Sequence, residues 1–247
     1  MDQFGARRGG EDLSEQRSAA TRALERWNAF PAGASPRPIV LVGPAVVPGQ
    51  GFEDGESKLA FARGDFALVG GVAAEAYELL SESSREGDVP GHGRVLALRS
   101  ATLGEADFMT DRGSRGLPAW LVDVEGVLGF VAVLTRSARS GCWEPPAEAA
   151  TSSRGPRQFA LPSSVSDDGM TLTFRFTSWP RSLAVYESAE AFESPSAVAV
   201  IPIERWTGPS TGWVTLAAAK REVEVRLASP LKGRVLVDLD GRAVPVY

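Results

Sequence analysis

The sequence predicts an α+β protein, mainly antiparallel sheet in two strand-rich subdomains, with an N-terminal helix. Three observations predict this class. Residues 196–247 are runs of strand-forming residues separated by turn residues. Within Lys220–Leu227 apolar and charged residues alternate, which is the two-residue period of a strand with one buried face. Residues 12–30, ahead of all the strand candidates, have a helical period instead.

The N-terminal helix is predicted over residues 12–30. Asp12 can cap it, and Pro31 ends it. The apolar face is formed by Leu13, Ala20, Leu24 and Trp27. A second, shorter helix is expected over 72–83, with Val72, Ala76, Leu79 and Leu80 directed inward. The strands expected in this first region are 38–43, 58–64, 66–70, 94–104, 105–111, 117–126 and 127–134.

The second strand-rich region begins at Met170. Its first strand should bury Leu172, Phe174 and Phe176 on one face. The further strands expected are 182–188, 197–203, 213–216, 222–227 and 234–239. Residues 136–169 are rich in Pro, Ser, Gly and Ala, and we interpret them as a linker. The predicted parts are therefore an N-terminal tail and helix (1–35), a first subdomain (36–150) and a second subdomain (151–247).

Charge and hydropathy exclude several classes of protein. The 247 residues have a formal net charge of −5, so there is no general basic surface for nucleic acid. No apolar run is long enough to span a membrane, and no export signal is visible at the N-terminus. The sequence as given therefore favours a cytoplasmic protein. A single cysteine, Cys142, cannot form an internal disulfide. Composition leaves the oligomeric state open.

Two acidic pairs are candidates for chemistry. Asp123 and Glu125 should share one strand face, as should Asp238 and Asp240. Paired carboxylates can serve acid–base catalysis or bind a divalent cation. Asp240-Gly241 is also a strong hairpin-turn signal, and we interpret these acids first as strand and turn residues.

The remaining candidates are aromatic or stand alone in the sequence. His92 is the single histidine, in a Gly-flanked loop, so a site of several histidines is excluded. Cys142 lies in the linker, where only His92 could activate it as a thiol. Trp206 and Trp213 bracket the loop 207–212 and could form an aromatic lip over a ligand such as a glycan, although packing against a sheet edge is the default. No phosphate loop, nucleophile elbow or metal-ligand cluster occurs in the sequence, so no cofactor is predicted.

Two stretches carry a resemblance to a known group. Residues 193–246 resemble a recurrent module of uncharacterised β-rich two-part proteins from high-GC Gram-positive bacteria, and 109–134 resemble the stretch that often precedes it. Many proteins of this group are exported or lipid-anchored. The resemblance implies an envelope or extracellular location and no particular activity.

The sequence favours a non-enzymatic binding or interaction module with a protein partner, and the resemblance implies that it acts at the cell envelope. Exposed strand edges could accept a partner peptide. One alternative is a small-molecule or glycan binder, or a weak hydrolase, that uses Asp123, Glu125, Asp238 and Asp240 with His92. Another alternative is a structural subunit of a larger assembly, docked through its N-terminal helix.

Overall fold

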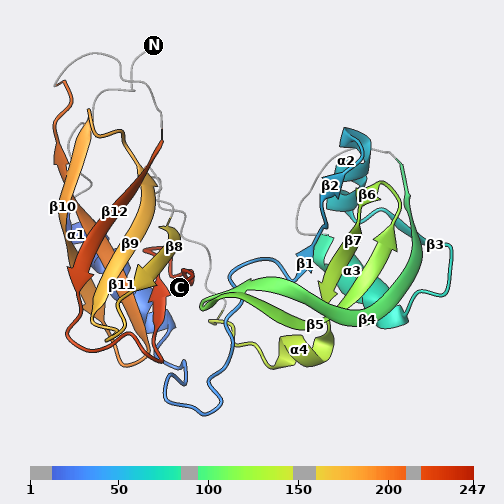
Figure 1. Cartoon of the computed structure of the whole chain (residues 1–247), viewed down its shortest axis with the longest axis horizontal. Helices are drawn as coiled ribbons and strands as arrows, with labels where there is room; N and C mark the ends of the chain where they lie inside the picture. Colours follow the sequence, from blue (N-terminus) through green and yellow to red (C-terminus); the bar gives the residue numbers. More distant parts are fainter. Residues whose placement is uncertain (1–12, 85–93, 147–159, 210–217) are drawn as a thin grey trace. The chain divides into compact units, whose positions relative to one another are not determined.

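The computed structural model describes residues 13–84, 94–146, 160–209 and 218–247 (Figure 1). The predicted class is confirmed: the described chain is α+β, with a helix at its start and mainly antiparallel sheets in separate groups. It divides into two compact units. Unit 1 comprises the chain up to Val42, residues Asp111–Gly113, and Glu144–Tyr247. Unit 2 comprises Gly43–Thr110 and Ser114–Trp143.

Unit 1 is built from two three-stranded sheets. One has the order β10 (Ala184–Glu193), β11 (Ala197–Trp206), β13 (Val235–Val237). The other has the order β12 (Ala219–Arg226), β9 (Thr171–Ser178), β8 (Ala160–Val165). Leu172, Phe174 and Phe176 of β9 are buried, as their alternation predicts, and they pack in one core with Val198 and Val200 of β11. The two sheets therefore form a sandwich around a shared core.

The helix α1 (Leu13–Arg26) covers the other face of β11. Ala197, Ala199 and Ile201 alternate with the core residues of β11 and are also fully buried. Ala20 and Ala23 of the helix are buried, as is Trp27, which directly follows it, whereas the predicted Leu13 is 37% exposed. Figure 1 shows α1 running along the strands of this unit. Unit 1 is thus three layers of helix, sheet and sheet.

The C-terminal residues join the two sheets of unit 1 along one side. Ala243 bridges to Val237 of β13, and Val246 bridges to Ser163 of β8. The N–H of Ser163 donates to the O of Pro245 at 2.8 Å, and the N–H of Tyr247 donates back to Ser163 O at 3.0 Å. On the opposite side β10 packs beside β12. Each end strand of the two sheets thus has a neighbour beside it among the described residues of this unit.

Unit 2 is a five-stranded sheet with helices. Its order is β1 (Val46–Val47), β7 (Phe130–Leu134), β5 (Gly113–Val124), β4 (Leu96–Thr110), β3 (Phe66–Leu68). A two-stranded sheet pairs β2 (Gly51–Phe52) with β6 (Val127–Leu128). The helix α3 (Ala74–Ser84) confirms the second predicted helix, and Ala76, Leu79 and Leu80 enter the core with Leu96, Leu98, Val122 and Val124. A short helix of five residues, α4 (Arg136–Ser140), follows β7.

One strand prediction in unit 2 is wrong because its capping signals were overlooked. Residues 58–64 fall in a helix, α2 (Gly55–Arg63), rather than a strand. Asp54 accepts a hydrogen bond from the N–H of Ser57 and caps the helix start, while Gly64, at φ 73°, ends it. Ser57 and Ala60 are buried three residues apart, as a helix requires.

Other element boundaries also need correction. Residues 38–43 contain no strand, and the first strand of the described chain is β1. The two strands predicted over 94–111 are one continuous strand, β4. The predicted linker 136–169 contains α4 and β8. Asp12, the strand predicted at 213–216 and the predicted boundary near residue 150 lie outside the described residues.

Candidate functional site

The acidic pair Asp238 and Asp240 is part of a turn. The N–H of Asp238 donates to the O of Arg242, and the Asp238 carboxylate accepts the N–H of Arg242 at 2.8 Å. Gly241, at φ 76°, takes the left-handed conformation that the turn needs, as the Asp-Gly signal predicts. Burial raises the pKa of Asp238 above its ordinary value, against the opposing effect of the Arg242 N–H. The Asp238 carboxylate therefore serves the backbone of its own turn.

The other acidic pair, Asp123 and Glu125, belongs to unit 2. Asp123 pairs with Phe130 in the ladder between β5 and β7. The Glu125 carboxylate is bound by the Arg94 guanidinium, which lowers the Glu125 pKa. Arg94 also lies 3.3 Å from Asp54, at the start of α2. Arg94 thus links a β-turn carboxylate to a helix cap, and Glu125 is ion-paired rather than poised as a base.

Of the two candidate tryptophans, Trp206 lies among the described residues and Trp213 does not. Trp206, the last residue of β11, packs edge-to-face on Trp179 with ring centroids 5.9 Å apart. Its Nε1 is buried without a hydrogen-bond partner among the described residues. Trp213 and His92 lie outside the described residues, so the predicted aromatic lip and histidine loop stay predictions. Cys142 is half-buried, and its Sγ lies 3.4 Å from the Ala138 O at the end of α4.

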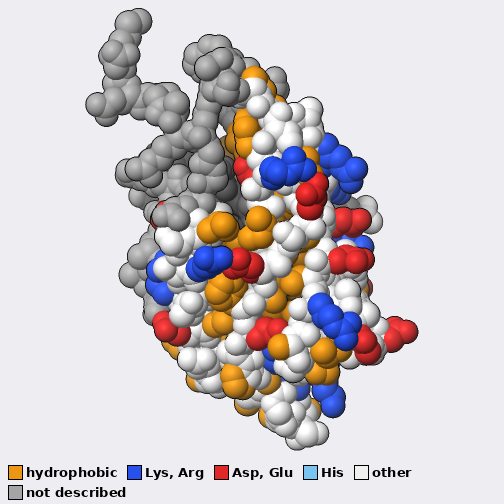
Figure 2. Space-filling view, turned by 90° about the vertical axis from the view of Figure 1, so that its left-hand side faces the viewer, with side chains coloured by type: hydrophobic (Ala, Val, Ile, Leu, Met, Phe, Trp, Pro, Cys, Tyr) orange, Lys and Arg blue, Asp and Glu red, His pale blue; other side chains and the backbone are white. Residues whose placement is uncertain are grey.

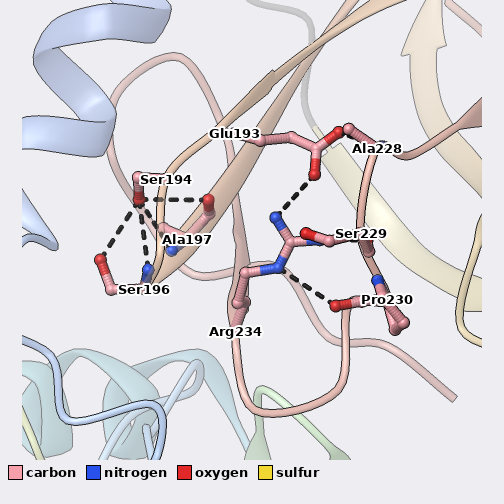
Figure 3. A network of polar contacts seen from close by, with 8 residues as sticks. All are labelled: Glu193, Ser194, Ser196, Ala197, Ala228, Ser229, Pro230 and Arg234. Carbon is pink, nitrogen blue, oxygen red and sulfur yellow. Dashed lines mark hydrogen bonds and ion pairs between the residues drawn. The ribbon is translucent and has the colours of Figure 1, made fainter.

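A shallow depression of about 510 Å³ lies in unit 1, between the β10–β11 turn and the loop 228–234. Figure 3 shows its polar groups. The Arg234 Nη1 donates to Glu193 Oε2 at 2.7 Å, and its Nε donates to the Pro230 O at 3.2 Å. The other Glu193 oxygen accepts the N–H of Ala228 at 2.6 Å. The Arg234 side chain is 7% exposed and the Glu193 side chain is 17% exposed, so the ion pair is largely shielded from solvent.

The polar groups of this depression bind one another. Burial raises the pKa of Glu193, but the Ala228 N–H and the Arg234 guanidinium outweigh that effect, and the pKa lies below its ordinary value. Ser194 Oγ accepts the N–H of Ala197 at 3.0 Å and so closes the β10–β11 turn (Figure 3). Because each of these groups has an internal partner, we interpret the network as a clamp on the loop 228–234 rather than as a ligand site.

A buried carboxylate continues the clamp. Asp111 is 2% exposed, is ion-paired with Arg37, and accepts the N–H of Val40 at 3.3 Å. Arg37 Nε in turn donates to the O of Gly233 at 2.6 Å. Sequence reasoning missed both shielded ion pairs, because an isolated Asp or Arg gives no signal that it is buried.

The five-stranded sheet of unit 2 ends in β1 on one side and in β3 on the other, and exposed apolar side chains lie at β3. β3 stands last in its sheet and pairs with β4 on one side alone among the described strands. Leu68 is 52% exposed and Val69 is 71% exposed. Val95, which directly precedes β4, is 55% exposed. An exposed strand edge with large apolar side chains is a template for pairing with another chain. We call Leu68, Val69 and Val95, together with the outer backbone of β3, the β3 edge.

Unit 1 differs from unit 2 in its charges. By sequence, unit 1 has 18 acidic and 18 basic residues, whereas unit 2 has 13 acidic and 8 basic residues. Figure 2 draws one face of the molecule, and on its described part positive side chains lie beside negative ones. Exposed ion pairs such as Arg205–Glu187 and Arg175–Glu222 in unit 1 are of this kind. The net negative charge of the chain thus belongs to unit 2.

Comparison of the chain with protein-family models, with curated proteins and with solved structures finds no match in any of the three. Among the described helices, none has the length and apolar character needed to cross a membrane. Within the same residues, no group of three His, Cys, Asp or Glu side chains could hold a metal ion.

Proposed function

We propose that this chain is a non-enzymatic protein-binding module, and that the β3 edge of unit 2 is its binding surface. The observation that carries the proposal is the exposure of Leu68 and Val69 at the end of a sheet. Single exposed apolar residues are ordinary on protein surfaces, but apolar side chains that flank an unpaired strand edge are not.

The contrast with unit 1 supports the same choice. There the edges are covered by the C-terminal residues and by the approach of β10 to β12, and the outer residues of β12 are charged. Charged edge residues prevent association. The β3 edge has neither protection among the described residues, so it favours association.

A paired lysine variant tests this function. The double variant Leu68→Lys/Val69→Lys places charge on the β3 edge. It should no longer capture the proteins that the wild type captures by crosslinking in native cells. Leu103→Lys, at a residue of β4 that is 65% exposed, is the matched control and should retain them. Circular dichroism must show that both variants are folded. Equal capture by the wild type and the double variant would overturn the proposal.

A further inference from the structure

We infer that the partner of the β3 edge is a short, extended, basic peptide segment that adds to the sheet as a sixth strand beside β3. This inference rests on the proposed function and specifies its mode and its ligand. It has three supports, namely the direction of the backbone groups of β3, the distribution of its apolar side chains, and the charge of unit 2.

The hydrogen bonds of β3 determine which of its backbone groups are open. The N–H of Leu96 donates to the Asp65 O at 2.8 Å, and the N–H of Val69 donates to the Leu98 O at 3.2 Å. Asp65 and Val69 therefore direct these groups toward β4. Because backbone groups of alternate residues in a strand point to opposite sides, the N–H and C=O of Leu68 point away from β4.

Leu68 thus offers a donor and an acceptor together on the open side. The neighbouring outward donor, the N–H of Phe66, is already bonded to the O of Gly64 at 3.0 Å. One residue that exchanges both bonds with Leu68 is the unit of an antiparallel strand pair. Gly70, which abuts the backbone of Arg99, and Gly71 follow the strand. The open edge is therefore short, and only a short segment can pair with it.

The side chains of the β3 edge are apolar on both faces. Leu68 lies on the same face as Phe66, which belongs to the core. Val69 lies on the opposite face, as does Ala67, whose ladder partner is Ala97. An added strand would therefore meet apolar side chains above and below the sheet. This arrangement favours a segment of β-branched residues over an amphipathic helix.

The charge of unit 2 predicts the sign of the partner's charge. Unit 2 carries the whole formal charge of −5, while unit 1 is balanced. Glu53 and Glu56, at the start of α2, are exposed and add to this field. A net negative field accelerates encounter with a positive ligand, and it does so less as the salt concentration rises. We therefore expect Lys or Arg residues to flank the paired segment.

Peptide probes test the mode of binding. The probe is Lys-Lys-Val-Thr-Val-Thr-Val-Lys-Lys, made also in two forms that are N-methylated at alternate core residues. N-methylation removes the N–H groups on one side of a strand only. Strand addition predicts that one form loses binding to the full-length protein by about tenfold or more, while the other form binds like the parent peptide. Equal binding of the two forms would overturn strand addition.

Variants of the protein test strand addition independently of the modified peptides. Leu68→Pro removes the outward N–H without removing a bond to β4, and it should weaken the lysine probe by about tenfold. Leu68→Ala keeps the N–H and should weaken the probe less. In wild type, the amide of Leu68 should become protected from hydrogen exchange when the probe is added. An unprotected Leu68 amide at saturating probe would refute the pairing even if Leu68→Pro fails to fold.

The charge is tested with a probe in which Glu replaces every Lys. The lysine probe should associate faster by about tenfold at low salt, with a difference that shrinks at high salt. Glu53→Gln/Glu56→Gln should reduce the difference, whereas Glu15→Gln/Glu224→Gln in unit 1 should preserve it. Equal binding of both probes would overturn the basic partner and leave strand addition intact. If neither probe binds while the lysine double variant still abolishes capture, the inference fails and the proposed function stands.

Discussion

The indole Nε1 of Trp27 donates a hydrogen bond of 2.9 Å to the backbone O of Gly241. The two residues are 214 positions apart, and Trp27 is fully buried. Arg26 reinforces the contact, because its Nη1 donates to the Asp240 O at 2.8 Å. The end of α1 is therefore fixed to the turn that follows β13.

Removal of this bond should destabilise unit 1. Trp27→Phe keeps an aromatic ring in the core but leaves the Gly241 O without its donor. We expect the free energy of unfolding to fall by about 1–3 kcal/mol, the usual cost of an unsatisfied buried acceptor. Urea denaturation followed by circular dichroism measures the change. Asn28→Ala, at an exposed neighbouring residue, should leave the transition where it is.

The largely shielded ion pair of Arg234 and Glu193 should show strong coupling. Arg234→Met leaves the partly buried Glu193 carboxylate without its guanidinium partner, and it should cost about 1–3 kcal/mol of stability. Glu193→Gln in the same chain should restore part of this loss. A double-mutant cycle in urea measures the coupling. The exposed pair Arg205–Glu187 is the control, with a coupling of about 0–1 kcal/mol. Additive effects at Arg234 and Glu193 would contradict the clamp.

Asp238 should make stability depend on pH in an unusual direction. Its pKa in the folded protein is raised by burial, so the folded state holds the proton more tightly than the unfolded state. Its contribution is therefore fully present below the unfolded pKa and is lost as the pH rises through the folded pKa. Asp238→Asn keeps an acceptor for the Arg242 N–H and should be more stable than wild type at pH 7.

The stability curves of wild type and Asp238→Asn, measured by urea denaturation from about pH 3 to pH 7, check this expectation. The advantage of the variant should disappear below the ordinary pKa of an aspartate. Glu125, whose pKa is lowered by Arg94, gives the opposite sign, because its contribution is lost as the pH falls through its folded pKa. If the free energy of unfolding of Asp238→Asn differs from that of wild type by the same amount at every pH, Asp238 does not titrate as expected.

Gly126 should not tolerate a side chain. Its φ is 78°, and a Cβ there would lie 2.3 Å from the Ser57 Oγ of α2. Gly126→Ala combines left-handed strain with this clash, and we expect unit 2 to lose about 1–3 kcal/mol or more. Gly55→Ala meets nothing within 4 Å and is the matched control. Thermal unfolding distinguishes the two variants, and equal melting temperatures would contradict the close approach of α2 to the β5–β6 turn.

Periodicity predicted the fold well where one face of a strand is buried. Leu172, Phe174 and Phe176 in β9 follow the two-residue period and enter the core. Gly241 was predictable as a turn residue because Asp-Gly carries its own conformational preference. The failure at 58–64 has a local cause, since the Asp54 cap and Gly64 terminus outweighed an apparent strand pattern.

The rest depends on contacts that are distant in sequence. Nothing near Asp111 indicates that Arg37, 74 positions away, will pair with it. Leu68 resembles any strand leucine until the order of the sheet makes β3 an edge. The acidic pairs were recognisable as strand and turn residues, but Arg94, the partner of Glu125, lies 31 positions away. The candidate surface was therefore foreseen only as a general expectation that strand edges could bind a peptide.

The insertion of unit 2 between two sequence segments of unit 1 has a consequence for biosynthesis. A ribosome translates Gly43–Trp143 before it reaches β8–β13, the described strands of unit 1. The core of unit 2 can therefore form on the nascent chain, whereas α1 must wait for β11 to be made. During that interval the buried face of α1, including Trp27, has no sheet to cover it. Chaperones that bind apolar segments should therefore engage this chain early, at its first helix.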